Sequence, residues 1–399
     1  MPGVKDKPAI LGGRPVFSDI FPFAQPTIPE LGELTPQLKE IFSSKNITNG
    51  KYVREFERST AKYLGVKNAV ALSCCTSGLI LTCKSLELTG EVIVPSFTFS
   101  ATVQALVWNN LKPVFVDCDP KNFNINAELI EDLITPRTSA IMAVHVFGMP
   151  ADVEALARIT KKHGLKLIFD SAHAIGARYK GVLVGGFGDA EVFSLSPTKV
   201  LTSGEGGIVA TNDDTLAKNL RIGRDYANPG DYNCQFAGLN ARMAEFNAIL
   251  GLKGLETMEQ KVTRRNELAE VYKKNLKNVP GISFQEGTPG SRSTYKDLSI
   301  LVEPKLFGLS RKILAECLDK ENIKIKKYYY PPVHRQKFIT SLFKVDENKL
   351  KVTNHVSGNI LSLPMFTHME EKDIVSICDA VKNIRAHASE IQVLLQSLV

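Results

Sequence analysis

The chain has 399 residues, a length that predicts about two domains around a large core. Apolar residues make up 44% of it and charged residues 23%, which is typical of a soluble globular protein. The net charge of +7 is spread along the chain with no basic, aromatic-rich stripe, so we expect no nucleic-acid partner and, at most, an anionic small substrate.

The seven cysteines are an odd number in a large chain and contain no CxxC motif, so the sequence predicts neither a disulfide framework nor a zinc site. No run of about 18 apolar residues predicts a membrane span. The start, MPGVKDKPAILGG, lacks a signal-type apolar segment. We therefore expect a cytoplasmic protein with free thiols, no metal site and no membrane contact.

Strands and helices alternate along the first half of the chain. After an extended arm at residues 1–30, this pattern predicts an α/β domain with a mostly parallel sheet and helices on both faces. The predicted helices are 36–44, 52–64, 78–88, 102–109, 126–133 and 152–163. The predicted strands are 69–72, 91–94, 113–117, 140–146, 165–170 and 208–211.

The pattern changes after residue 240. One or two long helices over 242–276 precede a mixture of strands at 295–302 and 323–326 and helices at 310–321 and 370–388. This mixture predicts a smaller α+β domain. We expect an N-terminal arm and helix near the small domain (1–44), a large domain (45–260) and a small C-terminal domain (261–399).

Three polar turns follow predicted strands of the large domain: Ser73–Thr76, Ser96–Phe99 and Asp170–His173. In open α/β sheets, ligands lie at the carboxyl ends of the strands. The sequence therefore predicts that these turns converge on one site. Read alone, the first turn also fits a helix N-cap that includes Cys75 and Thr76, and Asp170 equally fits a helix cap.

Lys199 lies in FSLSPTKVLTSGEGGIVATN, among apolar, small and hydroxylic residues. A lysine in such surroundings loses its proton more easily than a surface lysine, as a Schiff-base amine requires. A strand, a loop with one exposed lysine and a second strand is the other reading of the same stretch.

Other candidates also have two readings. Phe99 fits a ring that stacks on a planar ligand or a core residue. Asn240 fits a helix cap and Arg242 a surface salt bridge. His334, beside three tyrosines and two prolines, fits a site edge or a packed loop. The cluster Lys324–Lys327 fits a diphosphate site or a solvated strand edge.

The order and spacing of these motifs resemble the DegT/StrS family of pyridoxal-phosphate-dependent sugar aminotransferases over nearly the whole chain. The matching stretches are GGRPVF, ITNGKYVREFE, SCCTSGL, VIVPSFTFSAT, PVFVDCDPKNFNIN, VHVFG, FDSAHAIGA, FSLSPTKVLTSGEGGIVATND, GLNARM, YYYPPVHRQ and SLPM. The resemblance implies a fold-type-I aminotransferase-like architecture.

The resemblance implies roles for the matching residues. Lys199 would hold the cofactor as an internal aldimine, and Asp170 would pair with its pyridinium nitrogen. Ser194, Thr76 and the amide of Cys75 would bind the phosphate. His173 would contact the 3-hydroxyl side and Phe99 would stack on the ring. Asn240 would reach the phosphate of the neighbouring subunit, which implies a homodimer with shared active sites.

Three positions depart from the family pattern: Cys75 replaces the usual glycine, Phe169 the acidic residue often found before the aspartate, and Ser196 a common histidine or tyrosine. Lysine at 199, where related sugar dehydratases carry histidine, indicates amino transfer instead of dehydration.

The implied function is transfer of an amino group from glutamate or glutamine to a keto-sugar, in particular a nucleotide-linked keto-hexose. Amination of a keto-inositol and a non-catalytic, pyridoxal-phosphate-binding regulatory role are the alternatives. His334, Arg224 and Lys326 are candidates for the substrate side.

Overall fold

Seven strands form the central sheet of the computed structural model, which describes residues 7–397. Their order is β1-β9-β8-β5-β4-β2-β3, and β9 is antiparallel to both of its neighbours while the other pairs are parallel. The strands are β1 (Asn68–Leu72), β2 (Glu91–Pro95), β3 (Lys112–Val116), β4 (Thr138–Val144), β5 (Lys166–Asp170), β8 (Ala190–Ser194) and β9 (Gly207–Thr211). The predicted, mostly parallel sheet is confirmed.

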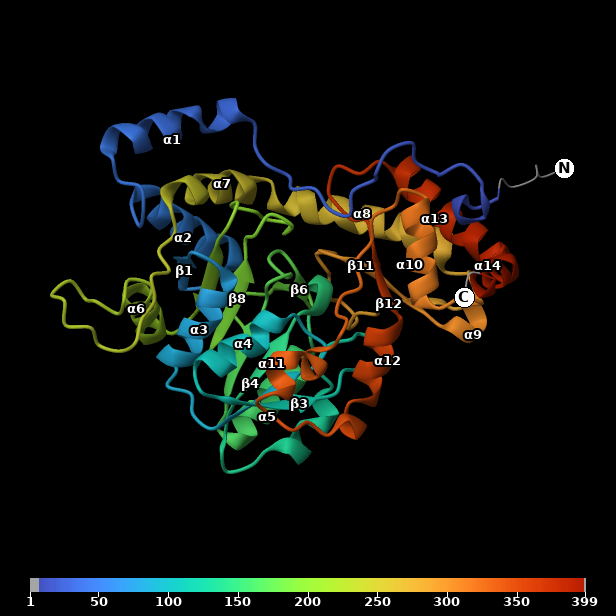
Figure 1. Ribbon diagram of the computed structural model, residues 1–399. Coiled ribbons are helices and arrows are strands. Elements are labelled where there is room, and N and C mark those ends of the chain that lie inside the picture. The colour runs from blue at the N-terminus through green and yellow to red at the C-terminus, as the bar shows by residue number, and fades with distance from the viewer. Residues whose placement is uncertain (1–6, 398–399) are drawn as a thin grey trace.

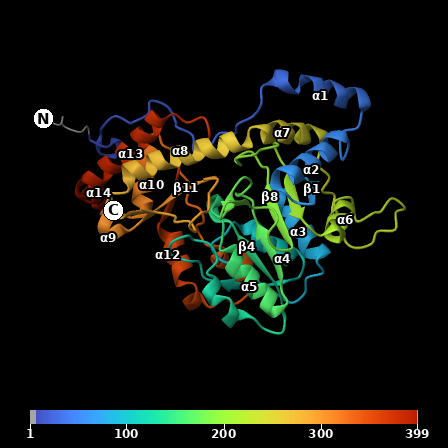
Figure 2. The same cartoon turned by 180° about the vertical axis from the view of Figure 1, so that it is seen from behind.

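Alternate residues of each strand face opposite sides of this sheet. In β1, Val70 and Leu72 join one buried cluster, whereas Ala69 and Ala71 join another. The first face is covered by α3 (Cys75–Ser85), α4 (Ser100–Trp108) and α6 (Asp214–Gly223), and the other by α2 (Lys51–Leu64), α5 (Val153–His163) and α7 (Glu245–Glu256). Figures 1 and 2 show the sheet between these layers.

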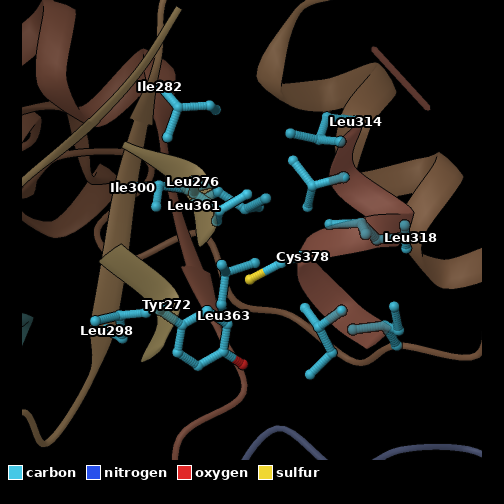
Figure 3. Close-up of a cluster of buried hydrophobic side chains, with 14 of the residues drawn as sticks. Tyr272, Leu276, Ile282, Leu298, Ile300, Leu314, Leu318, Leu361, Leu363 and Cys378 are labelled. Atoms are coloured by element: carbon cyan, nitrogen blue, oxygen red, sulfur yellow. The ribbon is translucent and has the colours of Figure 1, made fainter. Parts of the chain in front are cut away.

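A second, smaller core lies around a three-stranded antiparallel sheet, in which β11 (Leu298–Val302) is central between β10 (Ile282–Phe284) and β12 (Ile360–Leu363). Figure 3 shows side chains of this sheet, such as Leu298 and Leu363, in one buried cluster with Leu314 and Leu318 from a covering helix on the opposite side. The covering helices are α8 (Met258–Leu276), α10 (Arg311–Lys320), α13 (Glu371–Ala386) and α14 (Ala388–Gln396). The smaller α+β unit is thus present.

The N-terminal segment contacts both cores. Phe21 forms a bridge with Ile323 and packs on the smaller core. By contrast, α1 (Leu31–Ser44) buries Leu34 and Ile41 in a cluster with α2 and α7. It therefore packs on the large unit, beside α7 in Figure 1, and not on the smaller core.

The predicted border at residue 260 falls inside the continuous helix α8. Val262 of this helix belongs to a core of the large sheet, whereas Leu268 and Tyr272 belong to the smaller core. Val333 and Ile339, from the C-terminal part of the chain, also pack on the large unit. The division into 45–260 and 261–399 stays a prediction.

Several local predictions differ from the structure. The helix expected over 126–133 is two 3-10 turns, Ala127–Leu129 and Glu131–Leu133, and the strand expected over 323–326 forms isolated bridges. The sequence pattern missed α6 and α12 (Lys351–Asn359). The short elements α9 (Pro304–Phe307), α11 (Lys337–Thr340), β6 (Arg178–Tyr179) and β7 (Val182–Leu183) complete the fold. Within residues 7–397, no helix is long and apolar enough to cross a bilayer.

Candidate active site

A cavity of about 260 Å³ lies at the carboxyl ends of the central strands, where the polar turns were expected to converge. Seven of the eight predicted cofactor contacts line it: Cys75, Thr76, Phe99, Asp170, His173, Ser194 and Lys199. Cys74, Ser196, Thr198, Glu205, Lys296, Tyr328 and Tyr329 also contribute to its walls. The fold therefore brings together residues that are more than 250 positions apart in the chain.

One end of the cavity is built to receive an anion. Helix α3 begins at Cys75, and Cys75 and Thr76, the first two residues of its first turn, line the cavity, where a helix N-terminus favours an anion. Ser194 adds its hydroxyl, which donates to Ser196 Oγ over 3.3 Å. The helix-cap reading also holds, because Cys74 Sγ accepts a hydrogen bond from the Ser77 N–H.

Gly207 permits this arrangement. It pairs with Leu72 and Ser194 at the end of the sheet, and a Cβ atom built on it would lie 2.5 Å from the carbonyl carbon of Cys74. The strand and the α3 turn can approach this closely because residue 207 has no side chain. Glu205, two residues before Gly207, lines the cavity together with Lys199.

Asp170 ends β5 and is 4% exposed. Its Oδ2 accepts a 2.7 Å hydrogen bond from Thr102 Oγ1, and its Oδ1 accepts one from the Ala172 N–H over 3.1 Å. Burial raises the pKa of this carboxyl, although these two donors and the Lys199 charge oppose the rise. A buried carboxylate held by neutral donors and facing a cavity is a site for a cationic ligand group.

The Lys199 side chain faces the same cavity. Burial, followed by the nearby Lys296 ammonium group, lowers its pKa to about 8, while Asp297, Cys75 and Asp170 oppose the change. A substantial fraction of neutral amine near pH 8 suits a nucleophile and a proton carrier. Lys199 is therefore a buried lysine of the cavity, and the reading as an exposed loop lysine is wrong.

Aromatic rings also line the cavity. Phe99 is 57% exposed, so it is not a core residue, and its ring centroid lies 6.4 Å from that of Tyr329. Burial raises the pKa of Tyr328 to about 12, which keeps its phenol neutral. Burial and the charges of Lys199 and Lys296 hold the pKa of His173 well below its usual range, so its ring is neutral at pH 7.

Arg224 was expected on the substrate side, and the structure contradicts this. It is 6% exposed and donates from Nη1 to Glu57 Oε1 over 2.5 Å and to the Ala71 carbonyl over 2.6 Å. A buried guanidinium requires a buried counter-charge, and Glu57 supplies it behind β1. Arg224 therefore stabilises the large unit and does not reach the cavity.

His334 and Lys326 also lie outside the cavity lining. His334 is buried in a packed loop, with Nδ1 2.5 Å from Ser96 Oγ, so the packed-loop reading is correct. Lys326 is exposed and lines a separate groove. Asn240 is exposed and forms a bridge with Asp225 instead of capping a helix, since α7 begins at Glu245. Arg242 forms the surface ion pair with Asp225.

Sequence reasoning missed Lys296 and Thr102. Thr102 lies in the predicted helix that follows Ser96–Phe99, and one turn of helix from Phe99 places it beside β5. Lys296 had no comparable signal, because it lies in the C-terminal part of the chain before a strand. No cluster of side chains within residues 7–397 fits a metal ion, and all seven cysteines are free thiols.

Comparison with known proteins identifies the family. The family model described as DegT/DnrJ/EryC1/StrS aminotransferase family matches residues 30–382. The chain is 35% identical over 360 residues to dTDP-4-amino-4,6-dideoxy-D-glucose transaminase of Escherichia coli, covering 89% of this chain and 96% of that protein. It is 31% identical to GDP-perosamine synthase of Vibrio cholerae, covering 84% and 91%.

A solved structure has the same architecture. The crystal structure of DesI in the presence of its TDP-sugar product superposes with a TM-score of 0.91 at 31% identity, over 97% of this chain and 98% of that one. The fold-type-I expectation is thereby confirmed. This chain belongs to the DegT/DnrJ/EryC1/StrS aminotransferase family and is an enzyme of the aminotransferase class.

Proposed function

We propose that this enzyme moves an amino group from glutamate or glutamine to a nucleotide-linked keto-hexose, with pyridoxal 5'-phosphate as cofactor. The observation that carries the proposal is one cavity that contains a lysine of lowered pKa, a buried carboxylate and an anion-receiving helix terminus. The names of the relatives support the sugar class, because two are enzymes of dTDP- and GDP-linked amino sugars.

The residues of the cavity fit this cofactor. Asp170 would hold the protonated ring nitrogen, and the first turn of α3 with Ser194 would bind the phosphate. Phe99 would cover the ring, and its 57% exposure in the single chain leaves it available for this stacking. When bound, pyridoxal phosphate accepts the electron pair that is left when the donor's α-carbon loses its proton.

Lys199 would have two tasks. Its Nζ would attach the cofactor covalently, and after the donor's nitrogen replaces it, the same Nζ would move a proton between the donor's α-carbon and the carbon that bears the nitrogen. Thr102 would keep the Asp170 carboxylate oriented, since Thr102 donates its single hydroxyl proton to Asp170 and accepts one from Thr98 at 2.7 Å.

A basic groove of about 610 Å³ supports an acceptor with a diphosphate. Lys326 and Lys327 line this groove, which adjoins the cavity through Tyr328, a residue common to both. Lys324 in the same groove is already paired with Asp319 over 2.7 Å. The exposed Lys326 and Lys327 are thus the groups that we propose for the diphosphate.

We further propose a cytoplasmic homodimer in which Asn240 completes the phosphate site of the partner subunit. The exposure of Asn240 and its absence from the cavity lining of its own chain support this assignment.

A mass-detected panel tests the function. The purified holoenzyme is incubated with glutamate or glutamine and with dTDP-, GDP- and UDP-linked keto-hexoses or keto-inositols. We expect one nucleotide keto-hexose to gain an amino group and Lys199→Ala to abolish the gain. Amination of a keto-inositol alone, or a cofactor that no amino donor converts, would contradict the proposal.

A further inference from the structure

A second amine, Lys296, lines the cavity with Lys199. It is 4% exposed and comes from the segment that precedes β11, whereas Lys199 lies in the loop after β8. The basic side chains in the lining are Lys199, Lys296 and His173. Lys199 performs the chemistry and His173 is neutral at pH 7. Lys296 is thus the fixed cation that remains for binding an anionic part of a substrate.

The backbone around Lys296 is clamped from two sides. The buried guanidinium of Arg265 donates to the carbonyls of Thr294, Tyr295 and Lys296 over 2.7–3.3 Å. On the opposite side, the N–H groups of Thr294 and Lys296 donate to the carbonyls of Gly148 and Phe147 over 3.2 and 3.1 Å. The segment is therefore fixed on the large unit although it leads into the smaller sheet.

Gly148 makes this close approach possible. Its φ is +91°, and a Cβ atom built on it would lie 2.0 Å from Thr294 Oγ1. The same Thr294 hydroxyl donates to the His173 carbonyl over 2.6 Å. The position of Lys296 is thus coupled to the Asp170–His173 turn, which carries two other cavity residues.

The ammonium group of Lys296 is also held in place. Its Nζ lies 2.8 Å from Asp297 Oδ1, and it lies 5.4 and 5.9 Å from the ring centroids of Tyr328 and Phe23. An ammonium group has three N–H donors, and Asp297 takes one. The remaining donors and the rings make a preorganised cation site, to which Phe23 of the N-terminal arm contributes.

We propose that the Lys296 ammonium group binds the α-carboxylate of the amino donor. This inference rests on the proposed function, because it assigns the donor half of that reaction to a residue. An α-carboxylate is bonded directly to the carbon whose proton Lys199 moves, so its cation must lie beside Lys199. The diphosphate of a nucleotide sugar is separated from the keto carbon by the sugar ring, which fits the groove at Lys326 and Lys327 instead.

The electrostatics agree with this placement. Lys296 lines the same cavity as Lys199 and His173, and its charge contributes to lowering the pKa of each. A bound carboxylate would add a negative charge beside the Lys296–Asp297 pair and thereby raise the basicity of Lys199 when the donor is in place.

The experiment uses two cofactor-loaded variants, Lys296→Met and Lys296→Arg. Lys273→Met is the matched control, since Lys273 also pairs with a carboxylate, Glu270, and lies 5.1 Å from the Tyr295 ring centroid, but outside the cavity. The double variant Lys296→Met/Asp297→Asn avoids leaving Asp297 as an unpaired buried charge. Equilibrium binding of glutarate, an unreactive dicarboxylate, and the rates of the two half-reactions are measured.

We expect Lys296→Met and the double variant to weaken glutarate and glutamate binding by about 10- to 100-fold, the range for a charge-assisted hydrogen bond. Lys296→Arg should lose less, and the half-reaction with the keto-sugar identified by the panel should keep its KM. Unchanged glutarate binding, or an equal loss in both half-reactions, would overturn the inference while the transamination itself persisted. A wild-type holoenzyme that uses no amino acid would instead refute the proposed function, and this inference with it.

Discussion

Thr102 Oγ1 donates a 2.7 Å hydrogen bond to Oδ2 of Asp170, and no ion pair compensates this buried carboxylate within residues 7–397. Burial raises the Asp170 pKa above its ordinary 3.8, so the folded, cofactor-free protein holds this proton more tightly than the unfolded chain. Stability is therefore lost as pH rises from the ordinary pKa through the raised one. At neutral pH the charged Asp170 is a cost that a cationic ligand can relieve.

Asp170→Asn is expected to stabilise the cofactor-free protein at pH 7 and to abolish amino transfer. The amide oxygen can still accept from the Ala172 N–H, and the amide nitrogen can donate to Thr102, so the fold is preserved. Calorimetry should give a Tm higher by roughly 1–2 °C at pH 7 but not at pH 3. A lower Tm for Asp170→Asn at pH 7 would show that the charged Asp170 carboxylate does not destabilise the folded protein.

Attachment of pyridoxal phosphate to Lys199 should depend on pH with a midpoint near 8, because burial and the Lys296 charge lower the pKa of Lys199 to about 8. Borohydride reduction followed by mass spectrometry measures the attached fraction. Lys296→Met removes a neighbouring positive charge, which favours the protonated amine, so the midpoint should move upward toward 10.5. A midpoint near 10.5 in the unmodified protein would contradict the assigned environment of Lys199.

Gly207→Ala is expected to weaken pyridoxal phosphate binding about tenfold or more, since a Cβ atom would push against the Cys74–Cys75 peptide at 2.5–2.6 Å. Titration of the cofactor-free protein measures the Kd. Gly32→Ala in α1 is the control, because no atom lies within 4 Å of the added methyl group. Equal Kd values for the two variants would refute the role of the Gly207 contact.

Arg224→Ala should destabilise the protein by about 3 kcal/mol, because the buried Glu57 carboxylate would lose its buried partner and keep only the Ala71 N–H and the more distant, partly exposed Arg221. Arg221→Ala is the control: Arg221 is more exposed and lies 3.8 Å from the same carboxylate, so its loss should cost less than about 1 kcal/mol. Urea unfolding gives both values. The KM for the sugar should stay unchanged in folded Arg224→Ala, and a large rise would restore Arg224 to the substrate side.

Mixing Lys199→Ala with Asn240→Ala chains tests the shared site. In a mixed dimer, one cavity combines Lys199 with an intact Asn240 of the partner chain. If each variant alone is impaired, exchange of subunits should restore up to about a quarter of the wild-type activity. Activity that never exceeds the sum of the separate variants would place both residues in one chain's site.

The strand ends explain why much of the site could be predicted from the sequence. Asp170 and Ser194 end the parallel neighbours β5 and β8, and Cys75 begins the helix after β1. Because β1 runs in the same direction as β8 on the other side of the antiparallel β9, these residues meet at one edge of the sheet. The spacing of short apolar runs in the sequence predicts where these strands end. The resemblance of the motifs then assigned roles to these positions.

The positions of the Arg224 and Lys296 side chains could be determined only from the tertiary structure. Arg224 was expected to meet the substrate, but its counter-charge Glu57 lies 167 positions away in α2, and only the folded chain shows the pair. Lys296 reaches the cavity because Arg265, Phe147 and Gly148, from separate parts of the chain, fix its backbone.

The sequence by itself determined the alternation of strands and helices, the turns at the strand ends and the family, because these depend on neighbouring residues and on motif order. Tertiary structure decided which charged side chains face the cavity and which are paired in the core. That choice depends on contacts between distant segments, whose burial and counter-charges have no local pattern in the chain.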